Sequence, residues 1–144
     1  MRLALPSMRL HRGRVINITS GAAVNVIGGW GAYSAAKVAI NHLTMILAAE
    51  EPEITALALR PGLVDTAMQA TIREKGQGQM AESSYRRLAG AHAQGSLLPP
   101  DAPGRAIACL ALFAPHAWSG EVLQWDDERV QQLVAEAEAR AEAR

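Results

Sequence analysis

Tyr33 and Lys37, four positions apart, are the side chains whose types and spacing best suit acid–base chemistry. In a helix, residues i and i+4 are neighbours on one face, so the phenol and the ammonium group would lie side by side. A nearby ammonium group favours the phenolate, which helps Tyr33 to release or take up a proton near neutral pH. The chain has 12 arginines and only two lysines, so a lysine at position 37 goes against its composition. The pair is therefore the first candidate for a catalytic site.

Two further candidates follow short apolar runs of the chain. Ser20 comes after Arg14–Thr19, and Pro61-Gly62 comes after Ile54–Arg60. A serine hydroxyl can donate a hydrogen bond to an oxygen whose charge changes during a reaction. Taken singly, Ser20 is typical of a turn and Pro61-Gly62 of a strand exit. Only together with Tyr33 and Lys37 do they indicate a site.

The predicted elements place these residues at one edge of a sheet. The β-branched run Arg14–Thr19 predicts a strand buried on both faces. Apolar residues at helical spacing from Ala32 to Glu50, ended by Pro52, predict a helix of about five turns. Ile54–Arg60 predicts a second strand, and the resulting βαβ unit implies parallel strands. Ligands of such sheets bind outside the carboxyl ends of the strands, so all the candidates face one rim.

The rest of the chain predicts helices and one more strand. Residues 66–100 are polar and glycine-rich, and we interpret them as a mobile insertion with one or two short helices. Asp101 is the expected N-cap of a helix that runs through Phe113, and Gly120–Trp125 predicts a third strand. An apolar stripe in the tail predicts an amphipathic helix, formed by Val130, Leu133, Val134, Ala137 and Ala141.

Composition excludes several classes of protein. The 144 residues suffice for one domain, and 14 basic and 14 acidic side chains cancel, which argues against a nucleic-acid or membrane-surface partner. Cys109 is the single cysteine, which excludes a disulfide framework and indicates a reducing compartment. The longest apolar run, Ala106–Ala114, is too short to span a bilayer. The four histidines lack the spacing of metal ligands, so no metal site is expected.

Three stretches, GRVINITSGAAV, WGAYSAAKVAINHLT and ALRPGLVDT, closely resemble the catalytic half of the short-chain dehydrogenase/reductases. The Tyr-x-x-x-Lys motif of that family falls on Tyr33 and Lys37, and its catalytic serine falls on Ser20. The resemblance implies that Tyr33 is the general acid/base, that Lys37 supports it and holds the cofactor ribose, and that Ser20 polarises the substrate carbonyl. It also implies contacts to the nicotinamide and its phosphates from the segment after the second strand, through Pro61, Gly62, Val64 and Thr66.

The resemblance implies an α/β fold, a three-layer Rossmann-like parallel sheet, in truncated form. The Gly-rich turn of the family's first half is not found, because Gly28, Gly29 and Gly31 do not form G-x-G-x-x-G. The family's Asp-Gly-Gly after the last strand is replaced by Trp125-Asp126-Asp127. We therefore expect a partial Rossmann-like domain over residues 1–126, lacking the N-terminal half of the dinucleotide-binding fold, and a C-terminal amphipathic helix over 127–144.

The function implied is that of an NAD(P)-dependent oxidoreductase that interconverts an alcohol and a carbonyl, with NAD and NADP not distinguished. Its partners would be a small-molecule alcohol or carbonyl substrate and a second copy of the chain, in a cytoplasmic homo-oligomer. The strand at Arg14–Thr19 would become a sheet edge without its missing neighbour. The alternative is a non-catalytic truncated member of the family: a pseudoenzyme, an incomplete gene model, or an interaction module that uses the helix Ala32–Glu50.

Overall fold

The structure is a computed structural model, and it describes residues 3–143. Along the chain the elements are α1 (Leu5–Leu10), β1 (Arg14–Ile18), the 3-10 turn η1 (Gly21–Ala23), α2 (Gly31–Glu50), β2 (Thr55–Arg60), α3 (Ala67–Lys75), α4 (Glu82–Ala93), α5 (Asp101–Phe113), the 3-10 turn η2 (His116–Trp118), β3 (Val122–Gln124) and α6 (Glu128–Glu142). Within this range, no helix has both the length and the apolar composition needed to cross a bilayer.

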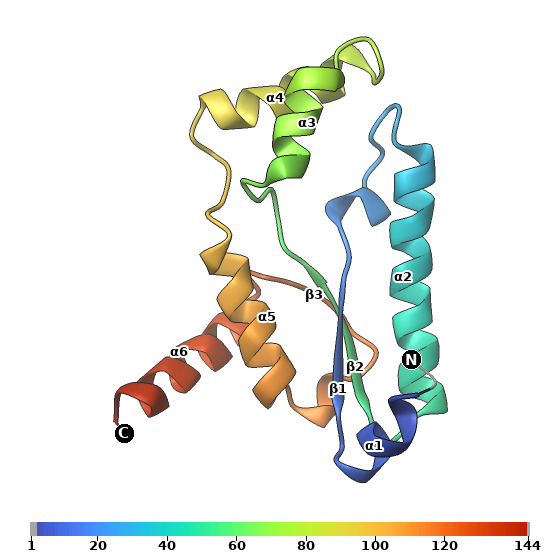
Figure 1. The fold of residues 1–144 in the computed structure, drawn as a ribbon, viewed down its shortest axis with the longest axis vertical. Coiled ribbons are helices and arrows are strands. Elements are labelled where there is room, and N and C mark those ends of the chain that lie inside the picture. Colours follow the sequence, from blue (N-terminus) through green and yellow to red (C-terminus); the bar gives the residue numbers. More distant parts are fainter. Residues whose placement is uncertain (1–2, 144) are drawn as a thin grey trace.

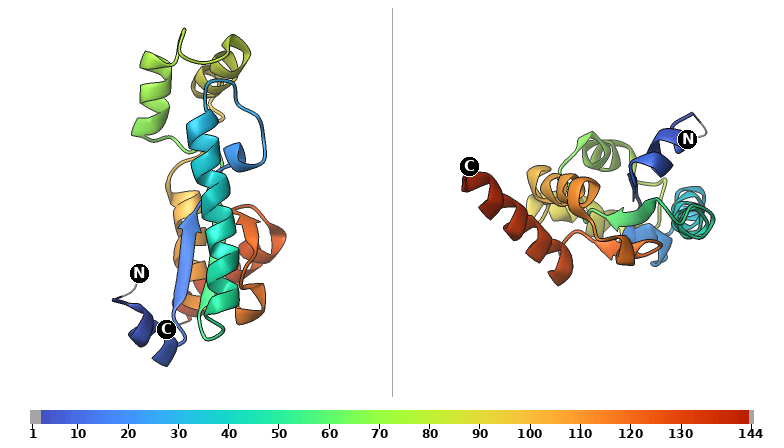
Figure 2. Two further views of the ribbon diagram at one scale, coloured as in Figure 1. Left: turned by 90° about the vertical axis from the view of Figure 1, so that its right-hand side faces the viewer. Right: turned by 90° about the horizontal axis from the view of Figure 1, so that it is seen from below.

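The three strands form one parallel sheet in the order β1-β2-β3, with Ile16 opposite Leu57 and Leu59 opposite Leu123. Helix α2 lies on one side of the sheet, and α5 lies on the other with α6 beyond it (Figures 1 and 2). The predicted βαβ unit and the three-layer Rossmann-like architecture are confirmed.

The central strand β2 explains why the two faces pack differently. Successive strand residues point to opposite faces, and Leu57 and Leu59 belong to the main core with residues of α5, β3 and α6. The alternate residues Ala56 and Ala58 are also fully buried and therefore face α2. Their small side chains let the helix approach the sheet closely. The core thus lies mainly between the sheet and the α5–α6 layer.

Strand β1 is less buried than predicted. The sequence predicted a strand buried on both faces, but its residues are half-buried or exposed, and Ile18 is 37% exposed. The reason is its position, because β1 pairs with β2 on one side and has no neighbour on the other among the described residues. The expectation that this strand forms an edge is confirmed. On the α2 side, Asn17 Nδ2 donates to the fully buried Thr44 Oγ1 at 2.9 Å.

Residues 66–100 contain two helices, α3 and α4, in agreement with the expected one or two, and their mobility stays a prediction. They stand at the carboxyl end of the sheet, beside the start of α2 (Figure 1). The loop before α2 packs tightly against the loop between α3 and α4: Ala81 N donates to Gly28 O at 3.2 Å. A Cβ atom on Gly28 would lie only 2.5 Å from Ala81 Cβ.

The predicted N-cap of α5 is wrong by one residue. Asp101 is the first helical residue, and Pro100 is the N-cap, without a side-chain hydrogen bond. Pro100 has a helical φ of −56°, which its ring favours, so the backbone turns before Asp101. The Asp101 carboxylate still lies in the first turn, where its negative charge interacts favourably with the positive end of the helix dipole.

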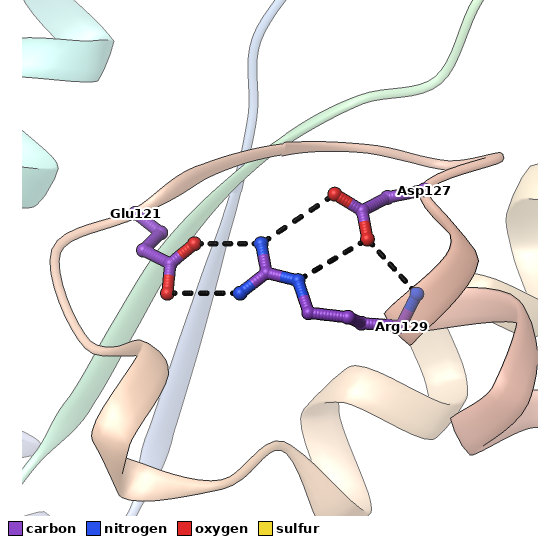
Figure 3. A network of polar contacts seen from close by, with 3 residues as sticks. All are labelled: Glu121, Asp127 and Arg129. Carbon is purple, nitrogen blue, oxygen red and sulfur yellow. Dashed lines mark hydrogen bonds and ion pairs between the residues drawn. The ribbon is translucent and has the colours of Figure 1, made fainter.

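Helix α6 is joined to the sheet by a polar network and by apolar contacts. Asp127 caps its first turn, accepting from Arg129 N at 3.0 Å, and the Arg129 guanidinium bridges Asp127 and Glu121 (Figure 3). The predicted apolar stripe begins in the core, with Val130 and Val134 buried, and ends at the exposed Ala141. The tail helix therefore shares the core of the sheet.

Candidate active site

Lys37 links helix α2 to the carboxyl end of β1. Its Nζ donates to Ile18 O at 2.9 Å and lies 5.6 Å from the centroid of the Tyr33 ring. The buried Thr19 adds a second link, because its Oγ1 donates to Lys37 O at 3.4 Å. The ammonium group is thus held beside the phenol, as the spacing of the two residues predicted.

Tyr33 lies in the first turn of α2 and packs against the residue before the helix. The rings of Trp30 and Tyr33 meet edge to face, with centroids 5.1 Å apart and planes at 72°, a favoured arrangement for aromatic pairs. Both rings line a cavity of about 520 Å³ between α2 and α3, with Met68, Thr71 and Ile72 on its other side. We call this the tyrosine cavity.

Ser20 lies at the end of β1 and lines a second cavity. Its backbone is extended, and its Oγ accepts from Ala22 N at 3.1 Å, which caps η1. The hydroxyl proton takes no part in that bond and can be donated to a ligand. The second cavity measures about 500 Å³, and we call it the arginine cavity after two of its lining residues, which include Ser20, Trp30, Arg60, Gly62, Arg87 and Gln124.

Pro61 and Gly62 follow β2, as predicted, and Gly62 borders the arginine cavity. The φ of Gly62 is +80°, a conformation that favours glycine. A Cβ atom here would lie 2.8 Å from Leu98 Cδ1 and 3.0 Å from Trp125 Nε1. The left-handed φ therefore favours glycine here, and a Cβ atom would also displace the ends of the Leu98 and Trp125 side chains.

The remaining predicted residues lie farther along the same segment. Val64 forms an isolated parallel bridge with Leu98, and Thr66 precedes α3, its Oγ1 donating to Val64 O at 3.4 Å. Neither residue lines the arginine cavity or the tyrosine cavity as formed by residues 3–143. The structure thus places Tyr33 beside Lys37, and it places Ser20 and Gly62 on the lining of the arginine cavity. Trp30 borders both cavities.

Several lining residues were not predicted from the sequence. Arg60 carries a usable signal, since it is a charged residue at the end of an apolar strand and directly before Pro61-Gly62. Trp30 and Arg87 carry none, because their place at the cavity depends on how the loop before α2 and helix α4 pack against the sheet edge.

Comparison with known proteins identifies the family. The short chain dehydrogenase family profile matches residues 1–77, more than half of the chain. The chain belongs to this family. A benzil reductase ((S)-benzoin forming) of Saccharomyces cerevisiae is 38% identical to this chain over 122 residues, covering 82% of this chain and 46% of the relative.

Solved structures agree with this assignment. A short chain dehydrogenase/reductase of Saccharomyces cerevisiae superposes with a TM-score of 0.88 at 34% identity, covering 92% of this chain and 53% of the other. A protein of Beutenbergia cavernae whose crystal structure holds NADP at low occupancy has a TM-score of 0.62 at 26% identity, covering 84% of this chain and 47% of the other. The chain spans about half the length of the curated relatives it matches.

Proposed function

We propose that this chain carries the catalytic residues of an NAD(P)-dependent oxidoreductase that interconverts an alcohol and a carbonyl, with Tyr33 as the acid/base. The observation that carries the proposal is the position of Lys37, bonded to Ile18 O and 5.6 Å from the Tyr33 ring centroid at the carboxyl end of the sheet. The similarity to a benzil reductase supports a carbonyl compound as the substrate.

The proposed reaction assigns one task to each side chain. In the reductive direction Tyr33 Oη gives its proton to the substrate oxygen, and in the oxidative direction the phenolate takes a proton from the alcohol. The Lys37 ammonium stabilises the phenolate that remains after proton donation. Ser20 Oγ donates a hydrogen bond to the same substrate oxygen, whose charge changes as the carbonyl reacts. A bound nicotinamide cofactor supplies or accepts the hydride.

The residues present fit the nicotinamide end of such a cofactor. Gly62, just after β2, carries no side chain that would block the approach of a cofactor to its backbone. Lys37 would hold the ribose, and Pro61, Gly62, Val64 and Thr66 would contact the nicotinamide and its phosphates. The family membership and the NADP in a structural neighbour support NAD or NADP without favouring one.

The proposed partners are a small-molecule alcohol or carbonyl compound and a second copy of the chain. Helix α2 presents large apolar side chains to solvent, with Val38, Leu43 and Met45 each about half exposed at 49%, 59% and 52%. Together with the free edge of β1 they favour a homo-oligomer. The single cysteine supports a reducing compartment such as the cytoplasm.

The test is an assay of the purified protein with NADH and NADPH against a panel of aromatic ketones, diketones and aldehydes that includes benzil. We expect consumption of a reduced cofactor and recovery of the matching alcohol. Binding of either cofactor with no turnover of any carbonyl compound would contradict the proposed activity.

A second candidate is a non-catalytic interaction module. The free edge of β1 favours it, because unpaired backbone groups can accept a strand from another chain. The same assay separates the two candidates: an interaction module would neither bind nor consume the reduced cofactor.

A further inference from the structure

Arg60 is a cationic side chain with a buried, unpaired nitrogen atom among the residues that the structure describes. It follows five buried residues of β2, and it lines the arginine cavity. Its Nε atom is buried and has no hydrogen-bond partner within residues 3–143. A buried donor on a charged group is costly when it is left unpaired, so this position calls for an acceptor.

A second arginine lines the same cavity from α4. Arg87 is exposed there, and no ion pair holds it among the described residues. The adjacent Arg86 is instead paired with Glu82 at 2.7 Å. None of the residues that line the cavity is acidic, and its other polar side chains, Ser20, Asn25 and Gln124, are neutral. The lining of the cavity, as formed by residues 3–143, therefore carries two positive charges and no negative one.

We propose that the arginine cavity binds an anionic oxygen group, and that this group is a carboxylate of the substrate. Arg60 would bind it at depth and Arg87 at the mouth, because guanidinium groups match carboxylates in geometry and form strong charge-assisted hydrogen bonds. This inference rests on the proposed function and adds the substrate class: a carbonyl compound that also bears a carboxylate.

The position of the cavity favours the substrate over the cofactor's phosphates as the source of the anion. Ser20, the residue proposed to bind the reacting oxygen, lines the same cavity as Arg60. Lys37, proposed to hold the cofactor ribose, does not line it in the part of the chain described. Tyr33 lines the tyrosine cavity, and Trp30 borders both cavities. A ligand whose carbonyl lies between Ser20 and Tyr33, beside Trp30, would extend its acid group into the arginine cavity.

The test compares substrates that differ only in charge. The purified protein is assayed with 4-carboxybenzaldehyde and with its neutral methyl ester, as wild type and as Arg60→Met and Arg87→Met. We expect each substitution to raise KM for the acid about tenfold or more, equivalent to about 1.4 kcal/mol, and to leave KM for the ester unchanged. Arg86→Met is the matched control on α4 and should change neither value.

A second arm distinguishes the source of the anion. Dissociation constants for NADH and NADPH are measured by fluorescence in the same variants. Unchanged cofactor affinity together with a lost preference for the acid supports the proposal. Weakened cofactor affinity with an unchanged ratio of acid to ester would assign the arginines to the cofactor's phosphates and overturn the proposal. Since Arg87 is exposed, its variant remains informative even if Arg60→Met fails to fold.

A third arm separates this inference from the proposed function. Binding of unreactive benzoate and of neutral benzamide is measured by NMR titration, which needs no turnover. Benzoate binding that Arg60→Met abolishes, without reduction of any carbonyl compound, supports the anion site while the proposed function fails. Reduction of neutral carbonyl compounds without benzoate binding or preference for the acid overturns the anion site while the proposed function stands.

Discussion

The Lys37 ammonium group makes two contacts whose consequences differ. Its hydrogen bond to Ile18 O fixes the side chain to the end of β1, and its position 5.6 Å from the Tyr33 ring centroid places a positive charge beside the phenol. The hydrogen bond to Ile18 O thus holds the ammonium group in its position beside the Tyr33 ring. Substitutions at Tyr33 and Lys37 test the proton-transfer chemistry, and the melting temperature of each variant shows whether the fold is affected as well.

Replacing Tyr33 by Phe removes the proton donor and keeps the ring that packs on Trp30. We expect turnover to fall about a hundredfold or more, the usual contribution of a positioned acid/base group, with the melting temperature unchanged. The chain offers a matched control in Tyr85, its only other tyrosine, whose Oη donates to Arg73 O at 3.1 Å. Steady-state kinetics are measured for Tyr33→Phe and for the control Tyr85→Phe. Equal turnover in Tyr33→Phe and wild type would refute the role of Tyr33 as the acid/base.

Replacing Lys37 by Met removes the ammonium group and keeps most of the side-chain volume. We expect a comparable loss of turnover, because the positive charge that would stabilise the phenolate is removed. Lys75→Met, at the exposed end of α3, is the matched control. Turnover in Lys37→Met equal to that of Lys75→Met would show that Lys37 does not support Tyr33.

At the level of elements, the candidate site lies at the ends of the strands. The loops after β2 and β3 contain positions where the backbone conformation or a side-chain contact restricts the residue type. Gly62, directly after β2, has a left-handed φ and close neighbours from two other segments. Asp127, shortly after β3, caps α6 and is held by Arg129. Each position can be tested against a control residue that lacks one of these features, Gly78 for Gly62 and Asp126 for Asp127.

Gly62→Ala should destabilise the protein in two ways. The left-handed conformation costs an L-residue roughly 1–2 kcal/mol, and the new methyl group would lie 2.8 Å from Leu98 Cδ1. Gly78 has a similar φ of +73° and nothing within 4 Å of its virtual Cβ, so Gly78→Ala isolates the conformational cost. Denaturant unfolding should show the larger loss at Gly62, and equal losses would mean that the contact with Leu98 relaxes freely.

Asp127→Ala should cost about 1 kcal/mol of stability at neutral pH, the usual value of a helix N-cap. The Arg129 hydrogen bond holds the pKa of the Asp127 carboxyl below its ordinary value of 3.8. Because the folded pKa is below the unfolded one, this stabilisation is complete above about pH 5 and is lost as the pH falls through the folded value.

The difference in unfolding free energy between wild type and Asp127→Ala should therefore narrow as the pH falls below about 4. Urea titrations at several pH values measure it. Asp126→Ala, at the exposed neighbouring position, should have an effect within about 0.5 kcal/mol at every pH. A difference in unfolding free energy that stays constant with pH would show that the charge of Asp127 does not contribute to stability.

The sequence predicted the elements better than their surroundings. The helix at α2, the strands and the amphipathic tail follow from apolar spacing and from breakers such as Pro52, which are local signals. The burial of β1 was predicted wrongly because the burial of a strand depends on its neighbours in the sheet. The pairing of Tyr33 with Lys37 follows from helix geometry, whereas Arg87 reaches the cavity only through the packing of α4.

For the whole molecule, the feature of greatest consequence is the asymmetry of the sheet. Strand β3 and helices α5 and α6 complete one side, while β1 ends the other side with unpaired backbone groups within the described residues. Helix α2, which carries exposed apolar side chains, lies on this same half of the molecule (Figure 2). Association through this half would cover both features.

We expect the 144-residue chain to be dimeric or aggregation-prone, because the edge of β1 and the exposed apolar side chains of α2 favour association within the described residues. Ile18→Lys places a charge on the free edge at a side chain that is 37% exposed, and it should reduce association. Light scattering at several protein concentrations measures association for wild type and Ile18→Lys. A stable monomer of the wild-type chain would contradict this expectation.

The contact between Gly28 and Ala81 constrains how this sequence can diverge. The two residues belong to loops that are 53 positions apart, and a Cβ atom on Gly28 would lie 2.5 Å from the Ala81 side chain. Only a small residue at each position allows the hydrogen bond from Ala81 N to Gly28 O at 3.2 Å. Side-chain size at the two positions should therefore covary among homologues: a larger residue at one is tolerated only with glycine or a rearranged loop at the other.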